Sequence, residues 1–104
     1  MNEIEKMMQN ANIKKYWNST PYGGIEEYYP PFTAEKQIAI LQLLTQQCDL
    51  TISHFTEWEF IHFDGQEPIQ VTGKNFTETF ARLINTYWQD LTEEERKQIK
   101  EILE

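Results

Sequence analysis

Few side chains in this chain could do chemistry, and the histidines come first. His54 and His62 are the only two, and neither an HxH nor an HExxH spacing is present. A metal site usually needs more than two protein ligands, so we expect no metal site. We expect His62 to form a surface ion pair with Glu67 across a hairpin, and a loose metal contact near Asp64 is the alternative.

Cys48 is the single cysteine of the chain. A catalytic thiol needs a histidine in reach and a lowered pKa, whereas the position of Cys48 at a predicted helix end, beside apolar residues, indicates a small buried group. A lone cysteine forms no internal disulfide, which fits a reducing cytoplasm. Gly23-Gly24 belongs to neither a P-loop nor a GxGxxG fingerprint. We therefore expect no enzyme activity, no catalytic residue and no cofactor.

Two glutamates, Glu57 and Glu59, lie two positions apart on a predicted strand and so share one face. Paired carboxylates perform acid–base chemistry in glycosidases, but they do so inside a cleft. An open sheet face is usually solvated, so this pair predicts a charged surface and no active site.

Negative charge is concentrated around this pair. The chain carries 17 Asp and Glu against 9 Lys and Arg, a net charge of −8, and no Lys or Arg occurs between Lys36 and Lys74. Such a surface repels phosphate backbones and anionic lipid, so we expect neither direct nucleic-acid binding nor membrane binding. The acidic sheet surface, as we call it, comprises Asp49, Glu57, Glu59, Asp64 and Glu67.

One function for the acidic sheet surface is mimicry of nucleic-acid phosphate, by which the chain would occupy the basic groove of a nuclease or repressor. The alternative is an ordinary solubilising surface. Ile61 and Phe63 are predicted on the same face, and they favour contact with a partner or with the chain's own N-terminal segment. We expect a protein partner with a basic surface.

Length and composition set the class of protein. A chain of 104 residues is typical of one compact domain, and 13% aromatic residues argue against disorder. No stretch approaches the roughly 18 apolar residues that span a bilayer. Residues 1–6 lack the basic start and apolar run of a signal peptide. We therefore expect a single cytoplasmic domain over residues 1–104.

The N-terminal third predicts a helix followed by a long loop. Apolar residues recur at helical spacing over 3–17, which predicts an amphipathic helix. Residues 18–32 hold three of the four prolines and two of the four glycines, which predicts a loop. Four rings in this loop either cover the core or form a binding element: Tyr22, Tyr28, Tyr29 and Phe32.

Thr33 is a suitable N-cap for a second helix, which the apolar spacing extends to about Gln47. The wide apolar face of this helix implies burial on two sides. The pattern then alternates, and three antiparallel strands are predicted between about 49 and 72, with Asp64-Gly65 in the second turn. The predicted core face of this meander comprises Leu50, Ile52, Trp58, Phe60, Ile69 and Val71.

The strand registers follow from pairing apolar residues on one face. In the second hairpin Phe60 is set opposite Ile69, and we prefer a 63–66 loop to a tight Asp64-Gly65 turn, because it keeps Pro68 out of a hydrogen-bonded pair. In the first hairpin Trp58 is set opposite Ile52 around a 53–57 turn. The other face of the sheet either meets water or is covered by the N-terminal helix and the aromatic loop.

Two further helices complete the chain. Asn75 and Glu78 have capping-box spacing at the start of a helix that runs to about Gln89, and Thr92 and Glu95 form the next capping box. The last helix has few apolar residues, so it either packs weakly or meets another copy of the chain. The predicted order is α-α-β-β-β-α-α, an α+β domain in which helices pack on the meander as a two- or three-layer sandwich.

Four segments share a pattern with a known group of proteins: the run Pro30-Pro-Phe-Thr-Ala-Glu-Lys-Gln37, the tryptophan-bearing hairpin, the stripe over 76–88 and Leu91-Thr-Glu-Glu-Glu95. Together they resemble small uncharacterised α/β sandwich proteins encoded by phages and prophages of Gram-positive bacteria. The resemblance covers roughly residues 30–98 and brings no catalytic residue. It implies a phage, prophage or mobile-element accessory protein with a structural, regulatory or counter-defence task.

Our leading expectation is a non-enzymatic accessory protein that binds another protein through its acidic surface. A structural or assembly protein that forms homo-oligomers through its C-terminal helix is the alternative. The predicted partner contacts are the acidic sheet surface together with Ile61, Phe63, Tyr22, Tyr28 and Tyr29.

Overall fold

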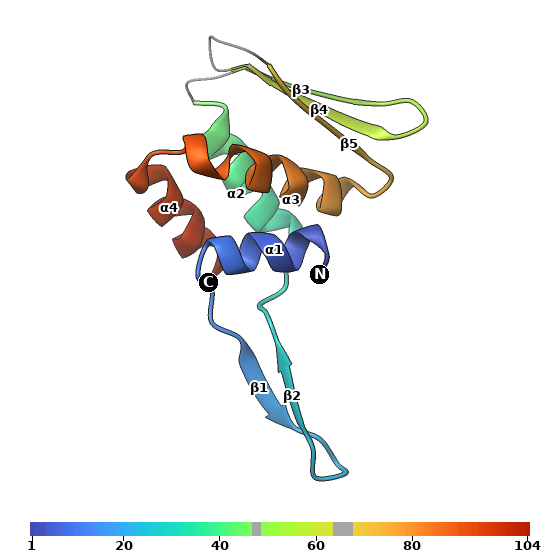
Figure 1. The fold of residues 1–104 in the computed structure, drawn as a ribbon, viewed down its shortest axis with the longest axis vertical. Coiled ribbons are helices and arrows are strands. Elements are labelled where there is room, and N and C mark those ends of the chain that lie inside the picture. Colours follow the sequence, from blue (N-terminus) through green and yellow to red (C-terminus); the bar gives the residue numbers. More distant parts are fainter. Residues whose placement is uncertain (47–48, 64–67) are drawn as a thin grey trace.

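The computed structural model describes residues 1–46, 49–63 and 68–104, and over them the chain is an α+β fold with four α-helices and two small antiparallel sheets (Figure 1). The elements in chain order are α1 (Glu3–Asn10), β1 (Tyr16–Ser19), β2 (Ile25–Tyr28), α2 (Ala34–Leu44), β3 (Asp49–His54), β4 (Trp58–Phe63), β5 (Ile69–Gly73), α3 (Phe76–Tyr87), the 3₁₀-helix η1 (Trp88–Asp90) and α4 (Glu93–Leu103). One sheet is the hairpin β1–β2, and the other is a meander in the order β3-β4-β5.

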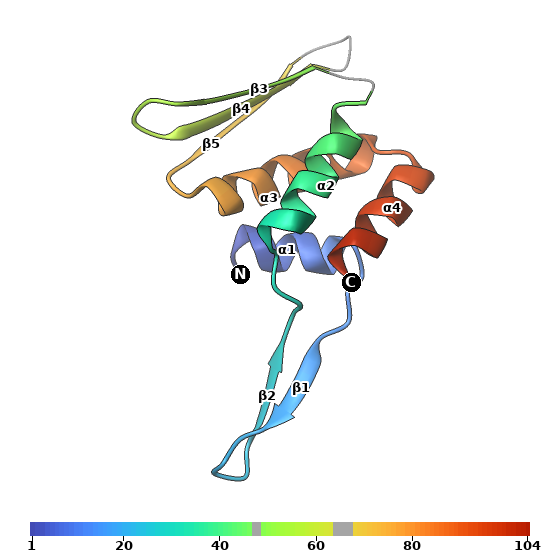
Figure 2. The ribbon, with the colours of Figure 1, turned by 180° about the vertical axis from the view of Figure 1, so that it is seen from behind.

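The core lies between the helices and one face of the meander. α3 packs on β4 and β5, α1 packs on α3 away from the sheet, and α2 packs on α4 (Figures 1 and 2). Phe80 of α3 joins these parts, because its ring stacks on Phe60 of β4 at 5.6 Å and on Phe32 at 6.2 Å between centroids. The predicted core face of the meander is confirmed, since all six of its residues are buried or pack against the core.

α1 is shorter than the predicted helix over 3–17. Asn12 has a φ of +56°, a left-handed conformation that asparagine tolerates better than most residues. The backbone N–H of Ile13 then donates to the carbonyl oxygen of Met8 at 2.9 Å, which closes the helix end. The predicted helix is therefore wrong beyond Asn10.

The predicted loop over 18–32 is wrong at 18–19 and 25–28, because β1 and β2 form a hairpin with Tyr16 opposite Tyr28 and Ser19 opposite Ile25. This hairpin is the element that the predicted order α-α-β-β-β-α-α lacks.

Turn residues close the tip of that hairpin. The N–H of Thr20 donates to the carbonyl oxygen of Gly24 at 2.8 Å, and its own carbonyl accepts from the N–H of Gly23 at 3.1 Å. Pro21 stands in the second position of the turn, where its fixed φ is favourable. Gly23 has a φ of +82°, which glycine adopts without steric cost.

Both registers of the meander differ from the prediction by two residues. Phe60 lies opposite Ile52 on one side and opposite Val71 on the other. Every side chain keeps its predicted face, because a shift of two preserves the alternation along a strand. The shift also leaves Pro68 outside the strands, where its missing N–H removes no ladder bond. The Asp64-Gly65 turn lies outside the described residues.

α2 begins as predicted, with the N–H of Lys36 donating to the Thr33 hydroxyl at 3.3 Å. It ends at Leu44, before the predicted end at Gln47, which lies outside the described residues with Cys48. Its wide apolar face is buried at Ile40 and Leu44 and packs against the core at Leu41 and Leu43, whereas Ile38 is 55% exposed.

α3 and α4 begin at the predicted caps. Asn75 accepts from the N–H of Glu78 at 2.9 Å, and Thr92 with Glu95 forms a reciprocal capping box. α4 buries Ile99 and Leu103 completely, so the predicted weak packing is wrong, while a contact with another copy stays a prediction. Over residues 1–46, 49–63 and 68–104 no helix has the length and apolar content needed to cross a membrane.

Candidate functional site

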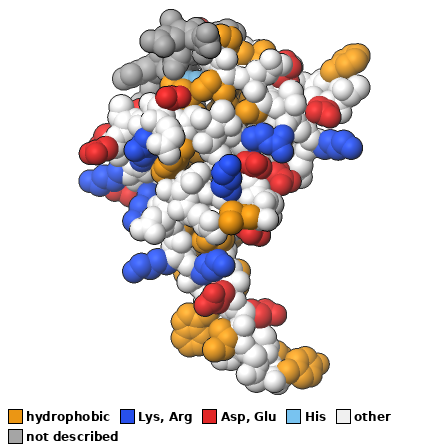
Figure 3. All heavy atoms as spheres, in the orientation of Figure 1, with side chains coloured by type: hydrophobic (Ala, Val, Ile, Leu, Met, Phe, Trp, Pro, Cys, Tyr) orange, Lys and Arg blue, Asp and Glu red, His pale blue; other side chains and the backbone are white. Residues whose placement is uncertain are grey.

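The β1–β2 hairpin is the main candidate binding surface, and we define the arm as residues 16–28. Both of its four-residue strands are exposed throughout. The arm projects away from the helices in Figure 1, and hydrophobic side chains gather along it in Figure 3. Exposed apolar groups that cluster in this way mark binding surfaces. The large exposed apolar side chains of the arm are Tyr16, Trp17, Tyr22, Ile25 and Tyr28.

The register gives each face of the arm an apolar cluster. On one face, the rings of Tyr16 and Tyr28 are 5.9 Å apart between centroids, and the amide of Asn18 donates to the Tyr28 phenol oxygen at 3.1 Å. On the other face, Trp17 and Ile25 occupy neighbouring cross-strand pairs. Isolated two-stranded hairpins are marginally stable in water. A cover on either face would therefore stabilise this arm as well as bury its rings.

The four rings of the predicted loop separate into two groups. Tyr29 and Phe32 pack against the core, as the core-cover prediction requires. Tyr22 at the tip is 98% exposed and Tyr28 is 44% exposed, so that prediction is wrong for both. Lys15 places its ammonium group 5.1 Å from the centre of the Tyr29 ring, at the base of the arm.

Sequence reasoning missed Trp17 and Ile25 as surface residues, because it assigned Trp17 to the end of a helix. The signal for a hairpin is nevertheless present. Thr20-Pro-Tyr-Gly-Gly24 is rich in turn residues and stands between two short segments of aromatic and β-branched residues.

The acidic sheet surface is spread along the meander. Asp49 begins β3, whereas Glu57 lies in the loop at the opposite end of that strand. At about 3.3 Å per residue, the two carboxylates are roughly 20 Å apart. Glu59 lies near Glu57 and accepts from the Gln70 amide at 2.6 Å. Asp64 and Glu67 lie outside the described residues.

Positive charge reaches this sheet from another element. The guanidinium of Arg82, on α3, donates to the carbonyl oxygen of Thr72 on β5. The sheet itself carries Ile61 half-buried on the outer face, opposite Thr51 and Gln70. Phe63 ends β4, and its backbone pairs with Asp49.

His62 is a buried residue, so its predicted surface position is wrong, and Glu67, its predicted ion-pair partner, lies outside the described residues. His62 is 1% exposed and lies opposite Leu50 and Ile69. Its ring centre is 4.4 Å from that of Tyr87, and neither ring nitrogen has a hydrogen-bond partner in the described part of the chain. No group of three His, Cys, Asp or Glu able to hold a metal ion occurs among the described residues.

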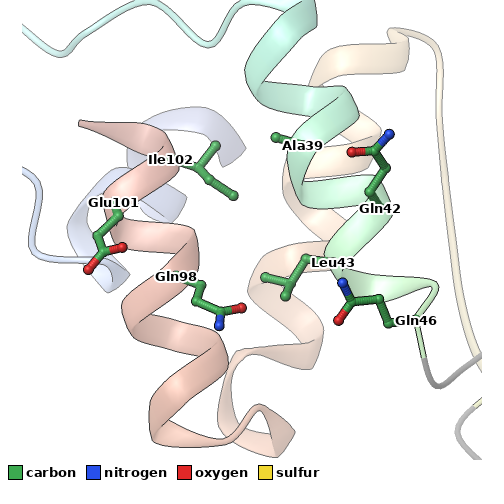
Figure 4. A pocket seen from close by; sticks show the side chains of 7 residues that line it. All are labelled: Ala39, Gln42, Leu43, Gln46, Gln98, Glu101 and Ile102. Carbon is green, nitrogen blue, oxygen red and sulfur yellow. The ribbon is translucent and has the colours of Figure 1, made fainter.

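Two clefts accompany these surfaces. One, of about 420 Å³, lies at the base of the arm and brings together Glu5, Lys15, Glu27, Tyr28 and Tyr29 among its lining residues. The other, of about 410 Å³, lies between α2 and α4 (Figure 4). Amide groups and one carboxylate surround a small apolar centre in this second cleft, which is lined by Ala39, Gln42, Leu43, Gln46, Gln98, Glu101 and Ile102.

Comparison of the chain with models of protein families, with curated proteins and with solved structures finds no match.

Proposed function

We propose that the protein acts by binding another protein, and that the arm makes the main contact. This proposal rests on one observation: exposed apolar side chains lie on both faces of a projecting hairpin. Burial of apolar surface drives association, and Trp and Tyr contribute a large share of interface energy. Trp17 at 67% exposure and Tyr22 at 98% exposure contribute little to the chain's own core. A partner that buries these two side chains gains the free energy of removing their apolar surface from water.

The wider role is part of the same proposal. A role as a phage or prophage accessory protein, with a regulatory or counter-defence task, is supported by the resemblance of residues 30–98 alone. The proposal of a non-enzymatic, cytoplasmic protein is supported by the sequence, which has no catalytic motif and a single cysteine. The finer description of the fold as a layered sandwich is supported by the predicted order of helices and strands. The acidic sheet surface is proposed as a second contact with the partner, because Asp49 and Glu57 on it are exposed to solvent.

The test compares two exposed aromatic sites at opposite ends of the molecule. Trp17→Ser with Tyr22→Ser removes rings from the arm, and Phe55→Ser removes the 95% exposed ring of the β3–β4 loop. Each tagged protein is used to capture partners from a lysate of the cells that encode it. We expect the arm variant to lose at least about tenfold in captured partner, as the loss of a hot spot does, and Phe55→Ser to retain it. If the parent chain, the arm variant and Phe55→Ser capture equal amounts of partner, the arm is not the contact.

The acidic sheet surface has its own test. Glu57→Lys with Glu59→Lys reverses its charge, and a contact driven by that charge would also weaken steeply as salt rises. Capture of the same partners by this double variant would exclude mimicry of nucleic-acid phosphate.

The alternative is a structural protein that assembles through α4. Light scattering at high protein concentration tests it, because a monomer under these conditions contradicts a homo-oligomer. A dimer that persists in the arm variant would favour the alternative, with the α2–α4 cleft of Figure 4 as the surface to mutate next.

A further inference from the structure

We infer that the segment bound by the arm is a basic, extended segment of the partner protein, which pairs with the free edge of β2 and continues into the cleft at the arm's base. This inference rests on the proposed function, because it specifies the chemistry of the partner at the same surface. Three observations lead to it: an unpaired strand edge, the position of two carboxylates, and the lining of the cleft.

The first observation is the open edge. β1 and β2 form a sheet of two strands, so each has one outer edge with no strand partner among the described residues. An exposed edge presents free N–H and C=O groups, and an extended peptide can pair with them as an added strand. Side chains of the added strand then lie beside those of the edge strand on both faces.

The second observation selects the edge of β2 and the charge of its partner. Residues 16–28 contain no Lys or Arg, and their two carboxylates, Glu26 and Glu27, are adjacent in β2. Adjacent residues of a strand point to opposite faces, so each face of the arm carries one carboxylate. β1 carries no charged residue, so its edge offers a basic segment no carboxylate.

Each carboxylate also has an aromatic ring near it. Glu27 lies directly opposite Trp17, and Glu26 lies one cross-strand pair along the same face from Tyr16 and Tyr28. A carboxylate beside an aromatic face binds Lys or Arg both as an ion pair and by cation–π attraction. Lys15, held over the Tyr29 ring at 5.1 Å, makes such a ring contact within the chain.

The third observation is the cleft of about 420 Å³ at the end of β2. Glu27 and Tyr28 belong to both the strand and the cleft lining, so a segment paired with β2 runs directly into it. The cleft adds the carboxylate of Glu5, so its lining holds two carboxylates against one cation, Lys15, which already lies 5.1 Å from the centre of the Tyr29 ring. The lining of the cleft is therefore acidic, as the arm is.

The same charges disfavour other occupants. Two arms joined through their β2 edges would bring the glutamates of one copy close to those of the other, which costs free energy. Nucleic acid and anionic lipid are repelled by carboxylates. A neutral lipid surface could accept the rings of the tip without pairing with β2, so it enters the test as a contrary outcome.

The test uses the whole chain and three short synthetic peptides. One alternates Lys and Val, one alternates Glu and Val, and one alternates Lys and Pro, which keeps the charge but cannot form the strand ladder. Backbone amide NMR shifts report which residues each peptide touches. We expect the Lys–Val peptide to bind at least tenfold more tightly than the other two. Its shifts should centre on Ile25–Tyr28 and weaken with salt.

Matched charge variants complete the design. Glu26→Gln with Glu27→Gln should weaken binding of the Lys–Val peptide about tenfold, while Asp90→Asn with Glu93→Gln removes the same charge from exposed positions of η1 and α4 and should leave binding unchanged. Equal binding of the Lys–Val and Lys–Pro peptides would overturn strand addition. Equal loss in both double variants would overturn the site.

Failure of this inference can be distinguished from failure of the proposed function. If the Lys–Val peptide does not bind, but partner capture still depends on Trp17 and Tyr22, the arm binds a partner of different chemistry and this inference is wrong. Binding of the arm to phosphatidylcholine vesicles would also overturn this inference. So would a dimer that the parent chain forms and the Trp17→Ser variant does not. If capture is also independent of the arm, both proposals fail.

Discussion

Replacing His62 by leucine should stabilise the protein, although His62 is part of the buried interior. The imidazole is 1% exposed, and its two ring nitrogens have no hydrogen-bond partner in the described part of the chain. A buried polar group without a partner costs about 1–3 kcal/mol. Leucine has a similar volume and no polar atom, so His62→Leu removes that cost.

The substitution also loses the ring contact between His62 and Tyr87, whose centroids are 4.4 Å apart. Aromatic pairs contribute about 0.5–1.5 kcal/mol beyond area burial. Taking the middle of both ranges, about 2 kcal/mol gained against about 1 kcal/mol lost, we expect a net gain of about 1 kcal/mol. For a domain near 100 residues this raises Tm by about 4–8 °C.

Thr79→Val is the matched control, because Thr79 is also 1% exposed but its hydroxyl donates to the Asn75 carbonyl oxygen at 2.6 Å. Removing this satisfied bond should lower the free energy of unfolding by about 1 kcal/mol. Thermal and urea unfolding followed by circular dichroism compare both variants with the parent chain. The reasoning is refuted if His62→Leu loses as much stability as Thr79→Val, because the imidazole would then be satisfied in solution.

Three further changes test the packing. A Cβ on Gly73 would lie 2.2 Å from the Thr79 hydroxyl oxygen, so Gly73→Ala should lower the free energy of unfolding by about 1–3 kcal/mol. The loss should be clearly smaller in a Thr79→Ala background, where that oxygen is absent. Equal losses in the two backgrounds, measured by urea titration, would contradict the clash. Asn85→Ala removes hydrogen bonds at 2.9 Å to the backbone and carboxylate oxygens of Glu3. It should therefore lower the free energy of unfolding by about 1–2 kcal/mol and speed amide exchange in α1. Thr86→Ala, at an exposed position of the same helix, should leave both nearly unchanged. Trp17→Ser should change stability by less than about 0.5 kcal/mol in the same titrations, because the ring is exposed, and a larger loss would mean that the arm packs on the body.

The meander shows what alternation in a sequence can and cannot predict. Its strands and core face were predictable, because apolar residues at every second position fix which side chains point inward. Its registers were not, because pairing Phe60 with Ile69 or with Val71 leaves the same face apolar. Loop length decides between them, and the position of Pro68 outside the strands follows from that choice.

The arm was missed for two physical reasons. Local helical spacing continues past Asn10, and only the left-handed conformation of Asn12 ends the helix there. Aromatic residues are also expected inside a protein, so the rings of Tyr22 and Tyr28 suggested core cover. That expectation fails in the arm, where Tyr22 is 98% exposed and Tyr28 is 44% exposed.

His62 was placed on the correct face but in the wrong environment. The register that set it opposite Glu67 made it an ion pair, and a shift of two residues sets it opposite Ile69 instead. The difference between a solvated ion pair and a buried imidazole with no hydrogen-bond partner among the described residues therefore depends on the register of one hairpin.

Amide hydrogen exchange of the chain, alone and bound to its captured partner, tests most directly whether the arm is the contact. We predict that exchange slows on binding at Tyr16–Ser19 and Ile25–Tyr28, where both strands are exposed in the chain alone. Unchanged exchange in the arm, with slowing confined to the outer face of the meander around Thr51 and Ile61, would contradict it.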